Sequence, residues 1–231
     1  MSEVSSSFRA LAIAWAVASI AAFCAAAAGY SLSDLRDVMS ACVVLSLLAV
    51  VAESLGVEFT DRITLTSSNL PVLLAMMFLG PAPAMVVAAA AGAWGCWRER
   101  SAFISLFNAC NFVIAAASGS LVFLLIDALW SFDRSAFSAG LLVAGGATAA
   151  AYECVNLAGV GFASLLMYRR PLATFWKTEL PPFARSLTVL TGMGLMTAAL
   201  YAEAGLVAVV LLFVPLFASQ YMFKLLANEK R

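Results

Sequence analysis

A single carboxylate lies deep inside an apolar stretch of this sequence, where few residues are of a type that does chemistry. Glu153 and Asn156 occur within the apolar run 137–168. Their spacing of three residues places both side chains on one face of a helix. A charged carboxylate near the middle of a bilayer costs about 3 kcal/mol on insertion scales, so it is expected to be protonated, paired or in contact with water. Glu153 is therefore the first candidate for a functional site.

A second polar stripe precedes it, in the run SLFNACNFVIAAASGS. Ser105, Asn108 and Asn111 recur there at spacings of three residues, which is typical of one helix face. Counted from the inner membrane surface, Asn111 lies about 14 Å deep and Asn156 about 18 Å deep, so the two stripes are expected to meet. We expect a protonated Glu153 to donate a hydrogen bond to Asn108, Asn111 or a backbone carbonyl of the same helix, because burial disfavours the ionised form. Asn156 belongs to the same expected cluster.

Such a polar cluster has two interpretations. In the first, its hydrogen bonds only hold helices together, at about 0.6 kcal/mol per bond in a membrane. In the second, the cluster is a ligand pocket, an ion path or a proton-linked switch. The first interpretation explains asparagines well but explains a carboxylate less well, because glutamine would form the bond without the cost of a charge. Both interpretations stay open at this point.

Other kinds of chemistry have little support in the sequence. The chain contains no histidine, which removes the usual metal ligand, the usual general base and any nucleophile–histidine pair. Its five cysteines fall in apolar runs without a CxxC pair, as expected of small buried residues. We therefore expect no enzyme, no metal site and no cofactor. The thirteen basic and thirteen acidic residues cancel, so nucleic acid is not an expected partner.

The composition indicates an integral membrane protein. Of 231 residues, 64% are hydrophobic and 11% are charged, whereas soluble domains average about 45–50% and about 25%. A core of this size cannot hide that excess, so the lipid bilayer is the expected partner. The alternating pattern of a membrane barrel is missing, which leaves helices as the way to satisfy the backbone in lipid. The sequence predicts an all-α polytopic bundle that forms one domain, residues 1–231.

A span needs about 20 apolar residues, and 17 are tolerable. On this basis the sequence predicts about eight spans, at 9–29, 36–55, 63–79, 81–97, 102–126, 138–168, 185–202 and 205–226. The first apolar run is longer than the 7–15 residues expected of a signal peptide, so we expect it to be retained. Pairs of small residues at close spacing, among them Ala88 with Gly92 and Gly192 with Gly194, predict close packing of the helices.

The orientation follows from the distribution of positive charge. With the N-terminus inside, all thirteen Lys and Arg residues except Arg36 and Arg134 fall on the cytoplasmic side. Both termini are therefore expected to be cytoplasmic, in a multi-pass protein of the bacterial cytoplasmic (inner) membrane.

Two of the connections have a character of their own. Residues 56–71 alternate apolar and polar side chains, and they predict either a short extended piece or a half-inserted lead-in to the third span. In the segment 171–182, Phe175 and Trp176 lie near one helical face and Lys177 lies elsewhere. This pattern predicts an interfacial helix parallel to the membrane at the level of the inner headgroups.

One segment carries a resemblance to a known family. Residues 62–123, RITLTSSNLPVLLAMMFLGPAPAMVVAAAAGAWGCWRERSAFISLFNACNFVIAAASGSLVF, resemble the multi-span N-terminal membrane region of bacterial HD-GYP-type cyclic-di-nucleotide signalling proteins. In that family the last span continues as a helix toward a cytoplasmic output domain, and FKLLANEKR, residues 223–231, looks like the root of that helix. The resemblance implies a membrane-embedded sensory or anchoring module, with an output domain or partner protein after Arg231. It carries over no catalytic residue.

A second resemblance leads to a different function. This chain is small, alanine-rich and polytopic, and in these respects it is similar to the S components of energy-coupling vitamin transporters. Those proteins bind a small molecule within the membrane. The alternative function is therefore a small-molecule uptake component with a small-molecule ligand. About eight spans is more than we expect for an S component.

Overall fold

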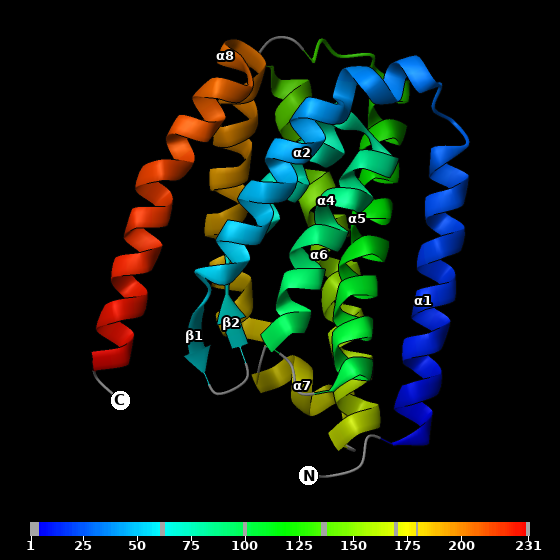
Figure 1. Cartoon of the computed structure of the whole chain (residues 1–231), viewed down its shortest axis with the longest axis vertical. Helices are drawn as coiled ribbons and strands as arrows, with labels where there is room; N and C mark the ends of the chain where they lie inside the picture. Colours follow the sequence, from blue (N-terminus) through cyan, green and yellow to red (C-terminus); the bar gives the residue numbers. More distant parts are fainter. Residues whose placement is uncertain are drawn as a thin grey trace.

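Nearly all of the chain is helical in the computed structural model, which describes residues 5–60, 63–98, 101–134, 138–168, 171–178 and 180–229. Figure 1 shows a bundle of long helices that run roughly parallel to one axis. The elements in order are α1 Ser6–Ala27, α2 Leu32–Ser54, β1 Val57–Thr60, β2 Ile63–Leu65, α3 Asn69–Leu74, the π-helix η1 Ala75–Leu79, α4 Pro81–Arg98, α5 Ala102–Trp130, α6 Ala139–Tyr168, α7 Leu172–Thr178 and α8 Leu180–Glu229.

Five helices of the described residues are long and apolar enough to cross a membrane. They are Ser6–Ala27, Arg36–Ser54, Ala102–Trp130, Ala139–Met167 and Thr191–Leu225. The last of them is interrupted at Gly205, where φ is 74° and ψ is −171°. Figure 1 shows that α8 turns back on itself there, so residues 180–204 and 206–229 form two neighbouring helices. The protein is a multi-pass, all-helical membrane protein apart from one short hairpin.

The predicted third span, 63–79, differs from the structure. Residues 63–65 form strand β2, and the helix begins only at Asn69. The six residues of α3 and the five of η1 together extend about 16 Å, about half of the 30 Å hydrocarbon core of a bilayer. This segment is a half-length helix, and the expectation of a full span fails here.

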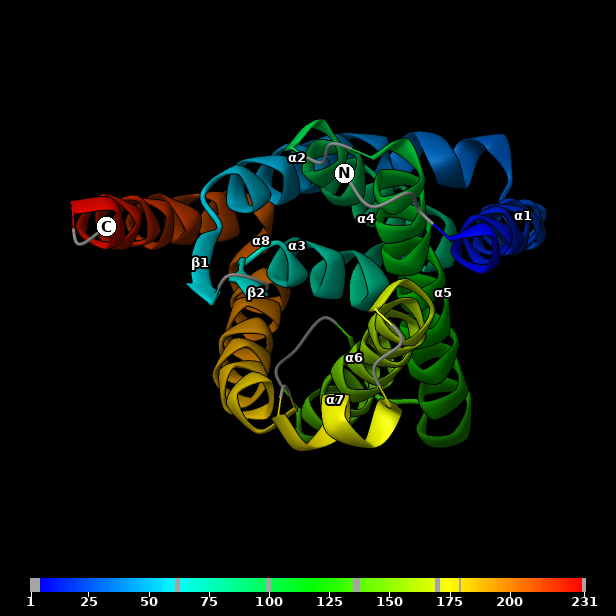
Figure 2. The ribbon, with the colours of Figure 1, turned by 90° about the horizontal axis from the view of Figure 1, so that it is seen from below.

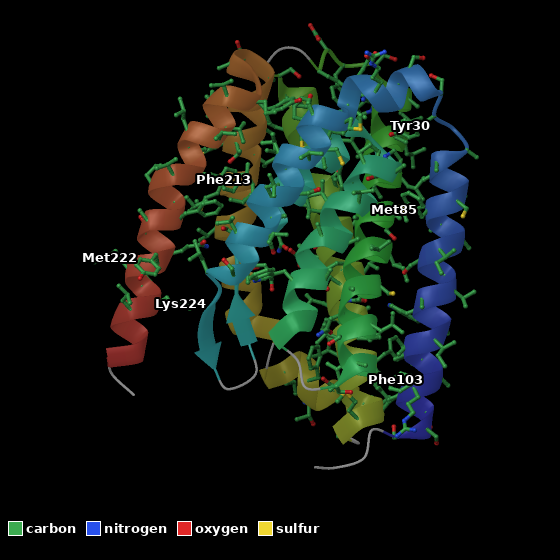
Figure 3. All side chains as sticks on the ribbon, viewed as in Figure 1. Tyr30, Met85, Phe103, Phe213, Met222 and Lys224 are labelled. Atoms are coloured by element: carbon green, nitrogen blue, oxygen red, sulfur yellow. The ribbon has the colours of Figure 1, made fainter. Side chains whose placement is uncertain are left out.

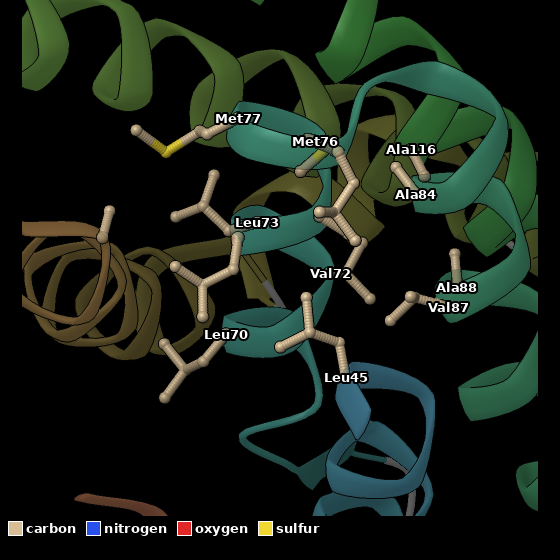
Figure 4. Packing of buried hydrophobic residues seen from close by; sticks show 14 of the residues in the cluster. Leu45, Leu70, Val72, Leu73, Met76, Met77, Ala84, Val87, Ala88 and Ala116 are labelled. Atoms are coloured by element: carbon tan, nitrogen blue, oxygen red, sulfur yellow. The ribbon is translucent and has the colours of Figure 1, made fainter. Parts of the chain in front are cut away.

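The half-length helix lies in the centre of the bundle. Leu70 to Met77 are buried without exception, and α3 contacts α2, α4, α6 and α8. Viewed from below, it is enclosed by the other helices (Figure 2). In Figure 4 its leucine and valine side chains pack against Leu45 of α2, Val87 of α4 and their neighbours. A helix that is apolar all round is stable only where it is enclosed on all sides, which explains this position.

The extended piece predicted within 56–71 is confirmed. Strands β1 and β2 pair antiparallel, with an irregularity between Glu58 and Thr60. The hairpin leads into α3, and β1 contacts α8.

The short helix α7 lies across the bundle axis, at the end where α1 begins (Figures 1 and 2). Phe175 packs edge-on against Trp176, with ring centroids 5.8 Å apart, and it covers Gly161 of α6. Trp176 and Lys177 are exposed. This transverse orientation agrees with the expected interfacial helix, and its placement at the headgroup level stays a prediction.

Gly80 ends the half-length helix and leads directly into α4. Its φ of 86° lies in a region that residues with a side chain rarely adopt. Tyr30 donates a hydrogen bond of 2.8 Å to the Leu79 carbonyl, and a Cβ atom on Gly80 would overlap the Tyr30 hydroxyl group.

Replacing Gly80 by alanine is therefore expected to destabilise the protein by about 2 kcal/mol through backbone strain and the lost tyrosine bond. The measurement is the midpoint of thermal unfolding in detergent. Gly146→Ala is the matched control, because a Cβ atom there meets nothing within 4 Å. A Gly80→Ala variant as stable as Gly146→Ala would contradict this account of the turn.

Candidate functional site

Glu153 lies near the middle of α6 and is 3% exposed. Its hydrogen-bond partner is Asn69, the first residue of α3, whose Nδ2 donates to Oε1 at 2.6 Å. The hydroxyl group of Tyr152 donates a longer bond of 3.4 Å to Oδ1 of the same amide. The two contacts fix the orientation of the Asn69 amide, with its donor toward the carboxyl group and its acceptor toward the phenol.

The second carboxyl oxygen, Oε2 of Glu153, is buried without a hydrogen-bond partner among the described residues. Buried polar atoms in proteins are almost always hydrogen-bonded, so such an atom needs an explanation. Glu153 lines a cavity of about 20 Å³, which is large enough for about one water molecule. The residues that line it are Asn69, Leu70, Leu73, Met76, Ala149, Tyr152, Glu153 and Thr191.

The residues just before Asn69 connect this cavity with two other elements. Ser68 donates a 2.7 Å hydrogen bond to Oε2 of Glu53 on α2. Ser67 donates a 3.0 Å bond to Oε1 of Gln220, in the second half of α8. One short segment thus binds Glu153, Glu53 and the helix 206–229.

A further contact strengthens the link to that helix. Lys224 donates a 2.8 Å hydrogen bond to the carbonyl oxygen of Ser54, at the end of α2. Lys224 and Met222 are both marked on this helix in Figure 3. Two polar contacts, through Gln220 and Lys224, therefore hold residues 206–229 against the elements beside the cavity.

The predicted partners of Glu153 are found in a different cluster. Asn111 Nδ2 donates to Oδ1 of Asn156 at 2.7 Å and to its carbonyl oxygen at 3.0 Å. Trp15 Nε1 of α1 donates to Asn111 Oδ1 at 3.1 Å. Gly159 makes room for this amide, because a Cβ atom there would overlap Asn111 Oδ1. This cluster joins α1, α5 and α6, and both groups of the Asn111 amide are satisfied.

Asn156 links this cluster to the Glu153 site, because its side chain interacts with the Glu153 carboxyl group and accepts a hydrogen bond from Asn111. Residues three apart on a helix point about 60° apart. Glu153 can therefore turn toward α3 while Asn156 turns toward α5. The hydrogen bond that we expected from Glu153 to Asn108 or Asn111 is replaced by the bond with Asn69.

The other two residues of the predicted stripe also lie on α5. Ser105 is buried and Asn108 is half-buried. The cavity beside Glu153 is lined by neither of them. Asn111, the third member of the stripe, bonds Asn156 of α6.

Reasoning from the sequence missed the residues that complete the Glu153 site. Asn69, Gln220 and Thr191 attracted no attention because they belong to segments distant from residue 153. A signal for Asn69 exists in the run TSSNLP, where polar residues followed by proline are typical of a helix start.

Comparison with family models, with curated proteins and with solved structures gives no match. The fold and the site by themselves define a class, a multi-pass helical membrane protein with a buried carboxyl group beside a small cavity. Within the described part of the chain, three or more His, Cys, Asp or Glu side chains nowhere gather as a metal-binding group would require.

Proposed function

We propose that this chain is the membrane-embedded sensory module of a bacterial signalling system. The state of the Glu153 site is the input, and the position of helix 206–229 is the output. A cytoplasmic output domain or a partner protein receives the signal from this helix. The resemblance of residues 62–123 to the membrane region of HD-GYP-type signalling proteins leads to the same function.

The observation that carries the proposal is the polar connection through the start of α3. Asn69 binds the carboxyl group of Glu153, and Ser67, two residues earlier, binds Gln220. A change at Glu153 that moves Asn69 also changes the contact between Ser67 and Gln220. Hydrogen-bonded networks that join two elements in this way are a physical route for coupling.

The π-helical turn η1 supports the proposal. The Gly80 amide donates to the Ala75 carbonyl at 3.0 Å, five residues back, so the turn is wider than in an α-helix. Such turns occur frequently at functional sites. Here it lies at the other end of the half-length helix, where a small shift of α3 is most easily absorbed.

The alternative, a small-molecule uptake component, is favoured by one observation. A discontinuous helix that ends near mid-membrane is a recurring way to build a substrate site in transporters. The size of the cavity counts against it, because about 20 Å³ holds roughly one water molecule, whereas ligand pockets measure about 300–1,000 Å³.

The test measures whether helix 206–229 responds to changes at the site. Spin labels are placed at Met222 and Leu121, which are 56% and 62% exposed, after the five native cysteines are changed to alanine. Pulsed electron resonance in lipid nanodiscs then gives the distance distribution between the labels. We expect Glu153→Gln to shift the distance distribution. The double variant Glu153→Gln with Gln220→Leu should shift it less, because Gln220→Leu removes the hydrogen bond between Ser67 and Gln220.

Val143→Leu, on an exposed face of the same helix α6, is the control and should leave the distribution unchanged. Identical distributions for the wild type and Glu153→Gln would overturn the sensory proposal. A small organic molecule that stays bound to the purified protein in native mass spectrometry, and is lost in Glu153→Gln, would favour the uptake component instead.

A further inference from the structure

We propose that the ligand of this site is a proton, which Glu153 exchanges with a single water molecule in the adjoining cavity. This inference rests on the sensory function proposed above and names its input. In chemical terms, the carboxylate of Glu153 takes a proton from a hydronium ion in the cavity, which leaves a carboxylic acid and one water molecule.

The geometry of the carboxyl group supports a ligand of this size. Oε1 accepts from Asn69, whereas Oε2 has no hydrogen-bond partner among the described residues, and the side chain of Glu153 lines the cavity. A water molecule has both donors and acceptors, so it is able to donate to the carboxylate and to accept from the carboxylic acid. One bound water therefore satisfies Oε2 in both protonation states.

A metal cation fits the cavity less well. Hard cations such as Ca²⁺ take six to eight oxygen ligands and Mg²⁺ takes about six. The lining offers one carboxyl group, together with the Asn69 amide, the Tyr152 phenol and the Thr191 hydroxyl, and its other four residues are apolar. A proton requires only one oxygen atom.

Among the side chains that the structure describes, none near Glu153 is a cation that pairs with it. Facing it among the described residues are the Asn69 amide from α3, Met76 from η1 and Thr191 from α8. Tyr152 and the Asn156 amide flank it on α6 itself. The contacts of α1 and α5 with α6 include the Asn111–Asn156 cluster, and those of α7 include Gly161. The charged residues near the start of α3 are Glu53, bound to Ser68, and Lys224, bound to Ser54.

Protonation has a structural consequence at Asn69. A hydrogen bond to a carboxylate is about twice as strong as one to a neutral acceptor. Adding a proton to Glu153 therefore weakens the bond between α6 and the start of α3. The adjacent contact of Ser67 with Gln220 transmits the change to helix 206–229.

The experiment is infrared difference spectroscopy as a function of pH on the full chain in lipid nanodiscs. We expect the carbonyl stretch of a protonated carboxyl group to appear as the pH falls and to be missing in Glu153→Gln. Labelling the glutamates with carbon-13 shifts this band. If Glu153→Gln does not accumulate in the membrane, Glu153→Asp is used instead. The carboxyl group at position 153 then belongs to an aspartate, so labelled glutamate no longer shifts its infrared band.

The distance between Met222 and Leu121 labels is followed over the same pH series. A band that titrates, with a label distance that follows it, supports both the proton and the sensory function. A titrating band with a constant distance supports the proton site and overturns the sensory function. A band that is present at every pH, or at none, overturns the proton inference. If the proton inference fails but Glu153→Gln still changes the distance between the labels, the sensory function remains supported.

Discussion

Replacing Asn69 by leucine is expected to destabilise the folded protein by about 3 kcal/mol. Leucine has the same branching and the same number of side-chain heavy atoms as asparagine, so it is a close apolar replacement. The carboxyl group of Glu153 loses its hydrogen-bond donor and stays buried at 3% exposure. A buried charged group without a partner costs the full penalty of removing it from water, about 1–3 kcal/mol or more. The midpoint of unfolding in detergent measures this loss.

The double variant Asn69→Leu with Glu153→Leu separates the two components of this effect. When both polar partners are replaced by apolar groups, stability is often unchanged or improved. We therefore expect the double variant to recover most of the stability that Asn69→Leu loses. If Asn69→Leu proved as stable as the wild type, the hydrogen bond to Glu153 would contribute nothing and the site would need another description.

The long helices were accessible from the sequence because lipid leaves the backbone few choices. The span predicted at 138–168 agrees with α6, Ala139–Tyr168. The span predicted at 81–97 corresponds to the helix α4, Pro81–Arg98, which is not among the five helices of the described residues that are long and apolar enough to cross a membrane. Proline is favoured at the first position of a helix, which fixed the start of α4 well. For these helices, hydropathy and the residues at the helix ends carry the information.

The half-length helix was inaccessible for a physical reason. The run 70–79 is as apolar as a spanning helix, and hydropathy does not distinguish burial in lipid from burial in protein. Only the packing of α2, α4, α6 and α8 around α3 shows that protein encloses it. The apolar pattern therefore predicted a helix correctly and its extent wrongly.

The partner of Glu153 was missed because the prediction relied on neighbouring spans. Helices that follow one another in sequence are usually adjacent, and α5 and α6 indeed share the Asn111–Asn156 contact. Asn69 lies 84 residues from Glu153. No spacing rule connects them, since their contact depends on the half-length helix beginning beside α6. The sequence therefore identified Glu153 as a site residue, but its partner Asn69 is determined by tertiary packing.

The second large effect concerns the contact between α4 and α5. Replacing Gly92 by alanine would place a Cβ atom 2.6 Å from the Cα atom of Ala109 and 3.2 Å from the ring of Phe112. The first of these neighbours is backbone, so no side-chain rotation relieves the overlap, and the two helices must separate. Overpacking of this kind costs about 3 kcal/mol. We expect a lower unfolding midpoint in detergent and less folded protein in the membrane.

Gly192→Ala is the matched control for this prediction, since both glycines belong to small-residue pairs in the sequence. A Cβ atom on Gly192 meets nothing within 4 Å. Alanine favours a helix over glycine by about 0.5–1 kcal/mol, so Gly192→Ala should be as stable as the wild type or slightly more stable. Equal effects of the two substitutions would contradict the close approach of α4 and α5. If only Gly92→Ala loses stability, the two glycines differ in their packing although their sequence contexts are alike. Gly92 faces the backbone of another helix, and Gly192 does not.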